Sequence, residues 1–277
     1  MKKNIILIMI AIAIISLPSC KKDKMKISIF AEHIEEIANQ NNISFSQAAK
    51  MVWDMGYRGV DCQYKIDPEH LRVLDSIGFY HAMALGQVFI TMAEHQEDVE
   101  EVLEFMKNNN FKYFLLVPGM YRSEPTNEDR RVVIERWRRI ADKAESMGLK
   151  IMAEVVDYPR TPLSNMLGLD WVLEEVPNLG CVFDFGNYIY AGDDVLDAYE
   201  HVRTKIDHVH LKDRQTTQNK DFTAIGDGIA PFKDVIMKLK EDGYEGWYTV
   251  EIFDSPDMLS DARKSINYLL NDKDLNP

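Results

Sequence analysis

A chain of 277 residues with 46% hydrophobic side chains can form one large domain or two small ones and is too apolar to be intrinsically disordered. Its 45 acidic and 32 basic side chains give a formal charge of −13. That charge argues against nucleic acid as a partner, because such binding depends on basic contacts to phosphates.

The N-terminal residues predict a secretion signal. Met1 is followed by two lysines, and residues 5–17 are an apolar run of signal-peptide length, too short for an ordinary membrane span. The run ends in L-P-S-C, with Cys20 last, which resembles the lipobox of bacterial lipoproteins. In that group the cysteine is lipidated and becomes the new N-terminus. A plain secretory signal with a chance cysteine is the alternative.

These features divide the chain into three parts. We expect a signal peptide over residues 1–19, a lipidated tether over 20–25 and a folded domain over 26–277. The protein would be a periplasm-facing lipoprotein of the cell envelope, in contact with the membrane through its lipid only. The other two cysteines, Cys62 and Cys181, are predicted to be small buried apolar residues and not a disulfide framework.

Strands and helices alternate along the rest of the chain. Short β-rich runs bounded by Gly or Pro predict strands, and apolar residues at helical spacing predict helices. The predicted strands span residues 26–31, 57–62, 79–85, 111–117, 150–156, 180–185, 205–214 and 247–253. The predicted helices span residues 45–55, 68–77, 94–107, 127–147, 166–176, 194–203, 232–241 and 257–270.

Eight strands alternating with eight helices predict an α/β fold with a parallel sheet. About 250 residues is the size of a single closed (β/α)8 TIM barrel. An open doubly wound sheet is the alternative, but no glycine-rich turn follows the first strand to indicate a dinucleotide site. No linker or internal repeat divides the domain.

The last four predicted strands each place a charged or imidazole side chain on one face near the C-terminal end. Side chains two apart in a strand share a face, and here the opposite face is hydrophobic in every case. The hydrophobic face must pack on the helices, so the other face points to the barrel axis. The residues expected there are Glu154, Asp184, His210 and Glu251. His208 and Lys212 share the inward face with His210.

Three carboxylates converging in a barrel mouth would repel one another and raise their pKa values. One divalent cation removes that problem. Three carboxylates and one imidazole form an oxygen-rich ligand set, which suits Mn²⁺ or Mg²⁺ better than the sulfur-rich or histidine-rich sets of structural zinc. We expect one ion, with Mn²⁺ first and Mg²⁺, Co²⁺ or Zn²⁺ as alternatives.

Each of these residues also has an ordinary structural explanation. Glu154 or Glu251 could pair with a basic side chain, Asp184 could cap the turn that follows it, and His210 could be a hydrogen-bonded core histidine. The matching position on four consecutive strands favours the joint metal site.

Five segments carry a resemblance to a known family. They are I-M-A-E at 151–154, C-V-F-D-F-G-N at 181–187, H-V-H-L-K-D-R at 208–214, G-D-G-I-A-P-F at 226–232 and G-Y-E-G-W-Y-T-V-E at 243–251. In this order the chain resembles the xylose-isomerase-like sugar isomerases and epimerases, which include ketose 3-epimerases, inosose dehydratases and, more distantly, endonuclease IV. The first-half histidines do not match the three-metal pattern of endonuclease IV.

The resemblance implies roles for individual residues. Glu154, Asp184, His210 and Glu251 match the family's metal ligands, and the two glutamates match its acid/base pair. Arg214 matches an arginine that contacts substrate. The epimerases usually have a histidine where this chain has Asn187, which puts ordinary epimerisation in doubt. We expect Asn187, His208 and Arg214 to bind substrate.

The hypothesis is therefore a metal-dependent isomerase or epimerase that acts on a non-phosphorylated keto sugar through an enediolate. Phosphorylated sugars are scarce outside the cytoplasm. A lyase, dehydratase or hydratase acting on a keto sugar or keto-glycoside is the first alternative. The others are a non-catalytic sugar-binding lipoprotein and a metal-independent enzyme that uses His208 and His210. The sequence leaves a homo-oligomer open.

Overall fold

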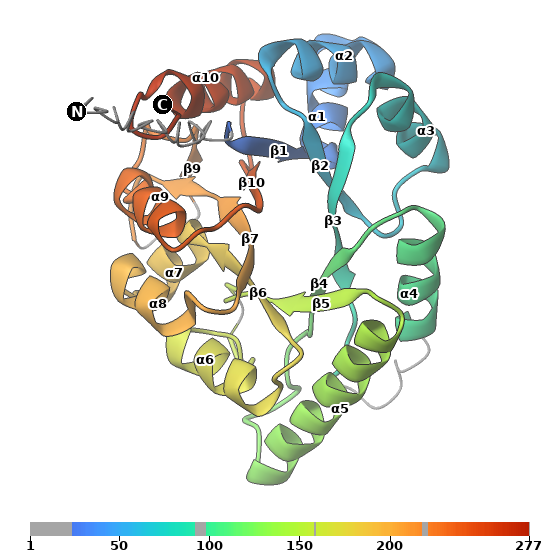
Figure 1. Ribbon diagram of the computed structural model, residues 1–277, viewed down its shortest axis with the longest axis vertical. Coiled ribbons are helices and arrows are strands. Elements are labelled where there is room, and N and C mark those ends of the chain that lie inside the picture. Colours follow the sequence, from blue (N-terminus) through green and yellow to red (C-terminus); the bar gives the residue numbers. More distant parts are fainter. Residues whose placement is uncertain (1–23, 92–97, 158, 218–220, 277) are drawn as a thin grey trace, which may run out of the picture.

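A closed barrel of eight parallel strands forms the centre of the computed structural model, which describes residues 24–91, 98–157, 159–217 and 221–276 (Figure 1). Its strands are β1 (Lys26–Phe30), β2 (Gly59–Gln63), β3 (Tyr80–Gln87), β4 (Tyr113–Val117), β5 (Lys150–Ala153), β6 (Gly180–Asp184), β7 (Ile206–Leu211) and β10 (Trp247–Val250). The barrel closes by pairing of β1 with β10. The predicted single TIM barrel is thus confirmed, and the open sheet is wrong.

The helices lie outside the strands. They are α1 (Ala31–Asn41), α2 (Phe45–Met55), α3 (Pro68–Ile77), α4 (Asp98–Asn108), α5 (Asn127–Ser146), α6 (Met166–Glu175), α7 (Phe185–Ala191), α8 (Val195–Val202), α9 (Phe232–Glu241) and α10 (Met258–Asn271). Two of them, α1 and α7, were not predicted. Both begin at the residue directly after a strand, so no loop marks their start.

The barrel interior has an apolar half and a polar half. On the side of β3 to β6 it is filled by a hydrophobic cluster that also includes Phe30 at the end of β1, while β1, β2, β7 and β10 bury hydroxyl, carboxylate and imidazole groups. The apolar cluster consists of Phe30, Met83, Leu85, Leu115, Met152 and Val182. Met152 and Val182 precede Glu154 and Asp184 by two residues, so the predicted inward face of β5 and β6 is confirmed.

The strands that carry the two glutamates are shorter than predicted. β5 ends at Ala153 and β10 ends at Val250, so Glu154 and Glu251 are each the first residue after a strand. Both remain buried, at 7% and 5% exposure. Cys62 and Cys181 are buried and unpaired, as predicted.

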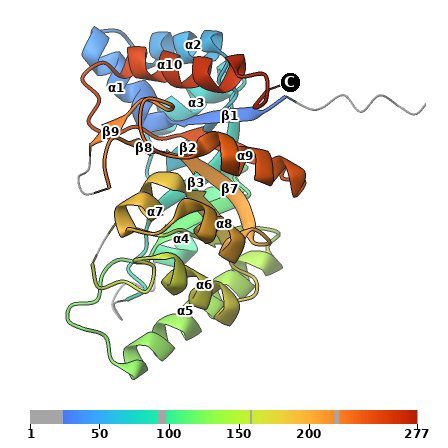
Figure 2. The same cartoon turned by 90° about the vertical axis from the view of Figure 1, so that its left-hand side faces the viewer.

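The segment between β7 and α9 contains a short antiparallel pair of strands. β8 (Asp213–Arg214) pairs with β9 (Phe222–Thr223), at the left in Figure 2. The Asp213 carboxylate holds the loop that follows, because it accepts backbone N–H groups from Arg214, Gly226, Gly228 and Ala230 at 2.9 to 3.1 Å. The H-L-K-D and G-D-G-I-A motifs are therefore two halves of one structural unit.

Replacing Asp213 by Asn should destabilise this unit, because an amide offers one acceptor oxygen where the carboxylate offers two. We expect the free energy of unfolding to fall by about 2 kcal/mol, the cost of leaving a buried donor unpaired. Urea denaturation would measure it. Asp227→Asn is the matched control, since Asp227 is an exposed carboxylate in the same loop. Equal stability of the two variants would contradict the role given to Asp213.

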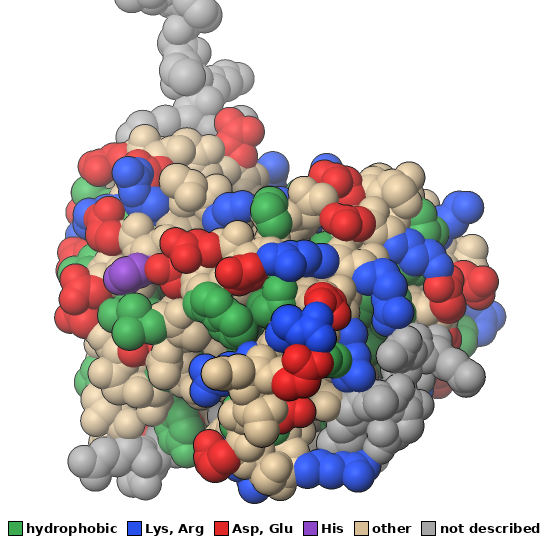
Figure 3. All heavy atoms as spheres, turned by 90° about the horizontal axis from the view of Figure 1, so that it is seen from below, with side chains coloured by type: hydrophobic (Ala, Val, Ile, Leu, Met, Phe, Trp, Pro, Cys, Tyr) green, Lys and Arg blue, Asp and Glu red, His purple; other side chains and the backbone are tan. Residues whose placement is uncertain are grey.

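Acidic and basic side chains are interspersed on the face that bears α5 and α6 (Figure 3). Arg131, Arg138 and Lys143 of α5 all form ion pairs with glutamates there. This mixture offers no broad basic surface on that face for a nucleic acid backbone. Among the helices formed by the described residues, none is long and apolar enough to cross a membrane.

Some predictions fall outside the described residues. These are the signal peptide at 1–19, Cys20 with most of its tether, and the first turn of the helix predicted from residue 94.

Candidate metal centre

The four predicted ligands meet at the C-terminal end of the barrel strands. Nδ1 of His210 lies 3.2 Å from Oε2 of Glu154, 3.2 Å from Oε2 of Glu251 and 3.8 Å from Oδ2 of Asp184. All four side chains are at least nine-tenths buried. Residues far apart in the sequence are thus brought to one point by the parallel strands that carry them.

Each of the four residues has one buried polar atom that makes no well-aligned hydrogen bond among the described residues, although Oδ2 of Asp184 forms an ion pair with Lys212. These atoms are Oε2 of Glu154, Oδ2 of Asp184, Nδ1 of His210 and Oε2 of Glu251. They are the same atoms that face one another across the site. Buried polar atoms are normally satisfied, so this group, which has one ammonium for three carboxylates, leaves room for a further cation that would bind them.

The donor chemistry fits a divalent cation. Ligand atoms of Glu154, Asp184 and His210 lie within 4.8 Å of one another, and Glu251 adds a further carboxylate oxygen beside His210. Three oxygens and one nitrogen form a predominantly hard set, which suits Mn²⁺ or Mg²⁺. The buried group could therefore hold a metal ion.

Lys212 brings a cation of the protein's own into this site. Its Nζ lies 2.8 Å from Oδ2 of Asp184 and 2.9 Å from Oε1 of Glu251, and it donates to Oδ1 of Asn187 at 3.1 Å. The side chain is only 5% exposed. The stem of Lys212 packs against Gly186, where a Cβ would lie 2.6 Å from its Cγ. The alternation of side chains along the strand predicted that Lys212 points inward, but its ion pairs with two of the predicted metal ligands were not predicted.

The charges of the site shift the pKa values of its members. Burial raises the pKa of Glu154 to about 7, with the His210 imidazole opposing the shift. Burial would also raise the pKa of Asp184, but the Lys212 ammonium and His210 outweigh it and hold that pKa below its usual range. Burial alone would lower the pKa of Lys212, yet Asp184 and Glu251 raise it, so the ammonium is retained.

Asp61, at the middle of β2, holds His210 from the opposite side. Its Oδ2 lies 3.2 Å from Nε2 of His210 and 2.8 Å from Nε2 of His208. His208 also contacts the hydroxyl of Thr249 at 2.8 Å, and Thr249 contacts Ser28 at 2.6 Å. This buried chain of polar groups directs Nδ1 of His210 toward the carboxylates, the arrangement in which a carboxylate orients a ligand histidine.

Asp61, His208 and His210 also form a compact group of metal-ligand type. Their short contacts are accounted for by hydrogen bonds to the Asp61 carboxylate, so we assign this group to support of His210. Asp61 was not predicted. Its sequence pattern, an acidic residue between apolar neighbours in a predicted strand, is the same pattern that indicated Glu154.

The residues expected to bind substrate lie at different depths. Asn187 is beside the ligands, with its amide donating to the Val155 carbonyl at 2.8 Å and its oxygen accepting from Lys212. His208 lies beneath His210. Arg214 is fully buried, donates to the Gly186 carbonyl at 2.7 Å and lies over the rings of Tyr190 and Phe222. The structure therefore brings Asn187 into the site, and a substrate contact by Arg214 stays a prediction.

Asp184 has both roles that its sequence position suggested. Its Oδ1 accepts the backbone N–H of Asn187 at 2.9 Å and caps α7, while Oδ2 faces the site. The cap therefore fixes the orientation of the ligand oxygen.

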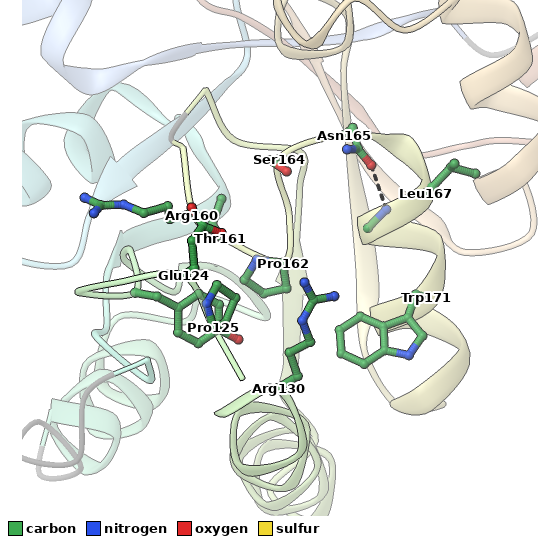
Figure 4. Close-up of a pocket in the computed structure, with 12 residues that line it drawn as sticks. Glu124, Pro125, Arg130, Arg160, Thr161, Pro162, Ser164, Asn165, Leu167 and Trp171 are labelled. Carbon is green, nitrogen blue, oxygen red and sulfur yellow. Dashed lines mark hydrogen bonds between the residues drawn. The ribbon is translucent and has the colours of Figure 1, made fainter. Parts of the chain in front are cut away.

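Two cavities are lined by loops that follow barrel strands, at the same end of the barrel as the centre. One, of about 420 Å³, is lined by the loops after β4 and β5, by the first turn of α5 and by the first half of α6 (Figure 4). The other, of about 280 Å³, shares Tyr121 and Arg160 with it and extends to Gln87 at the end of β3. These cavities offer space for parts of a ligand outside the four-residue centre.

Comparison with known proteins gives a consistent set of relatives. Residues 54–271 match the family described as "Xylose isomerase-like TIM barrel". An inosose dehydratase of Lacticaseibacillus casei is 24% identical over 254 residues, which cover 77% of this chain and 84% of that protein.

Solved structures with the same fold include two enzymes of different reaction types. The probable 3-DHS dehydratase of Bacillus anthracis has a TM-score of 0.74 at 17% identity, covering 90% of this chain and all of that one. A 3-keto-D-glucoside 4-epimerase of E. coli has a TM-score of 0.70 at 18% identity, with the same two coverages. At these identities the structures support the fold alone.

Proposed function

Because the chain belongs to the xylose isomerase-like TIM barrel family, we propose that it is a divalent-metal-dependent enzyme acting on a non-phosphorylated keto sugar. The observation that carries the proposal is the convergence of three buried carboxylates, those of Glu154, Asp184 and Glu251, within 3.2 to 3.8 Å of Nδ1 of His210. A sugar-binding protein without catalysis would not need three carboxylates buried at one point.

The two glutamates would act as the general base that removes a substrate proton and the general acid that returns it. A bound divalent ion supplies Lewis-acid stabilisation of negative charge on the substrate oxygens. Glu154 or Glu251 takes the proton from the carbon next to the carbonyl, which gives an enediolate. Return of the proton on the other face gives an epimer, and return to the neighbouring carbon gives an isomer. Asn187 and Lys212 lie beside the two bases and would orient the sugar hydroxyls.

Elimination is the second candidate. The same proton removal followed by loss of a β-hydroxyl or glycosyl group gives a dehydratase or lyase, and the reverse reaction is a hydratase. Two observations favour it. Asn187 stands where the epimerases usually have a histidine, and the relatives that match most of this chain include an inosose dehydratase.

The test begins with the metal content of protein lacking residues 1–20. We expect close to one divalent ion per chain, and its loss in an Asp184→Ala, His210→Ala double variant that keeps its circular dichroism spectrum. Wild-type protein that holds no metal, even after metal is added, would overturn the proposal and favour a binding protein.

The base assignment has its own test. Keto sugars incubated in D₂O with the metal-loaded enzyme should exchange a C–H proton or lose water, which mass spectrometry and NMR distinguish. Glu154→Gln or Glu251→Gln should slow the reaction by a factor of about 100 or more, the usual contribution of a general base. Wild-type exchange in both variants would rule these residues out as the bases.

For the cellular location, we propose the lipoprotein that Cys20 indicates. The support is the signal layout and the L-P-S-C motif. Mass spectrometry of protein from a bacterial envelope should find a lipidated Cys20 as the first residue, and Cys20→Ala should release the protein from the membrane fraction. An unmodified N-terminus after another residue would favour the plain secretory signal.

A further inference from the structure

The larger rim cavity, of about 420 Å³, has a volume in the range of small-molecule sites. Its walls come from two loops on the mouth side of the barrel. Tyr121 and Glu124 follow β4, Arg130 lies in the first turn of α5, and Asn165 and Trp171 lie at the start and middle of α6. None of these residues is a proposed metal ligand.

Backbone hydrogen bonds connect the segments that line the cavity to each other and to the chain just after Glu154. Val156, two residues after Glu154, donates its N–H to the Leu163 carbonyl at 2.8 Å, and Tyr121 donates to the Arg160 carbonyl at 2.9 Å. Two residues span at most about 7 Å, and Leu163 lies between the lining residues Pro162 and Ser164, so the hydrogen bond from Val156 connects the lining segment to the chain just after Glu154. A ligand larger than one sugar could reach both places.

Arg130 gives the cavity a positive charge, and Glu124, which lines the same cavity, is not within ion-pair distance of it. Glu128 pairs with Arg131 at 2.6 Å, and Asp129 accepts from the Thr126 hydroxyl at 2.7 Å. Among the described residues, no carboxylate lies within ion-pair distance of Arg130. Figure 4 shows its side chain rising from α5 toward Pro162, with the Trp171 ring across from it. A guanidinium in this position suits a carboxylate, which it can bind through two parallel hydrogen bonds.

The remaining walls suit a sugar ring. Trp171 offers an aromatic face, and Glu124 offers acceptors for hydroxyl groups. Asn165 uses its Oδ1 to cap α6 at Gly168, which leaves its amide N–H groups as donors. The Tyr121 hydroxyl has no hydrogen-bond partner among the described residues, although the side chain is only 6% exposed.

We propose that the rim cavity is a subsite for a second, acidic sugar unit of the substrate. The carboxylate of a uronic acid would pair with Arg130, its ring would lie against Trp171, and Glu124 and Asn165 would bind its hydroxyls. The inference rests on the proposed function, because it takes the other sugar unit of the substrate to be the keto sugar that reacts at Glu154 and Glu251. It makes the substrate a glycoside with a uronic acid unit.

The test measures binding to the subsite alone. Methyl β-D-glucuronide and methyl β-D-glucoside are titrated into metal-free protein in EDTA, with calorimetry and saturation-transfer NMR as readouts. We expect the glucuronide to bind at millimolar concentration and the glucoside at least ten times more weakly. Arg130→Gln and Trp171→Ala should each weaken glucuronide binding at least tenfold. Arg131→Gln is the control, because it removes the same charge one residue away, outside the cavity.

Equal binding of the two glycosides, no binding of the glucuronide, or unchanged binding in Arg130→Gln would each overturn the subsite. Because EDTA is present throughout, these outcomes are independent of the metal. Failure of wild-type protein to bind Mn²⁺ in the separate metal assay would instead count against the proposed reaction and leave the subsite result in place.

Discussion

Lys212→Met is expected to lower the stability of the metal-free protein by about 3–5 kcal/mol, the cost of removing one partner of a buried ion pair. Methionine has a similar length and no charge, so Asp184 and Glu251 would lose the ammonium that lies within 2.9 Å of both. The two carboxylates and Glu154 would then share only the charge of His210. Urea denaturation in EDTA would measure the loss.

The same variant should gain more from metal than the wild type does. A divalent ion would replace the missing positive charge, so the increase in melting temperature on adding Mn²⁺ should be larger in Lys212→Met, and its Mn²⁺ dissociation constant should be at least tenfold lower. Lys150→Met is the control, since Lys150 pairs with Asp207 in a partly exposed position far from the site and should cost less than about 1 kcal/mol. A Lys212→Met protein as stable as the wild type in EDTA would show that the ammonium does not neutralise the carboxylates.

Asp61→Asn is expected to weaken Mn²⁺ binding by a factor of about 10 to 100, the usual effect of losing the partner of a ligand histidine. A carboxylate only accepts hydrogen bonds, so Asp61 requires a proton on Nε2 of His210 and leaves Nδ1 to act as a ligand. An amide at position 61 can donate as well as accept, so it no longer fixes that choice. Calorimetry with Mn²⁺ would measure the affinity.

Thr249→Val tests whether weaker Mn²⁺ binding comes from lost orientation of His210 or from a general loss of packing among the buried polar groups. Thr249 contacts His208 and Ser28 but makes no hydrogen bond to His210, so its loss should reduce stability and leave Mn²⁺ affinity within about twofold. If Thr249→Val weakened Mn²⁺ binding as much as Asp61→Asn, the effect would come from packing. Unchanged Mn²⁺ affinity in Asp61→Asn would remove Asp61 from the metal centre.

The strand pattern was enough to predict the barrel and the four converging residues. Period-two alternation fixes which side chains point inward, and parallel strands put their C-terminal ends together. Glu154, Asp184, His210 and Glu251 could therefore be placed at one point from parity alone. The same rule applied to β2 would have included Asp61, which lies between the buried Val60 and Cys62.

Other features could not be read from local sequence. Helix α7 is buried at Phe185, Gly186, Asn187, Tyr188 and Ile189, so it lacks the alternation of apolar and polar faces that identifies a surface helix. Lys212 was seen to point inward, but its ion pairs depend on the distance between β6, β7 and β10. The anchoring of the loop at 226–230 by Asp213 depends on a contact of the same long-range kind.

The direction of the strands has a consequence for how the protein meets its surroundings. All eight barrel strands run the same way, so the chain enters at Lys26 on the face opposite the mouth. The tether proposed for residues 20–25 would span at most about 20 Å when extended. A lipid on Cys20 would therefore hold the barrel close to the bilayer by the end opposite the candidate metal centre. Such an enzyme would draw its substrate from the water beyond the membrane, and products released from it would enter the same compartment.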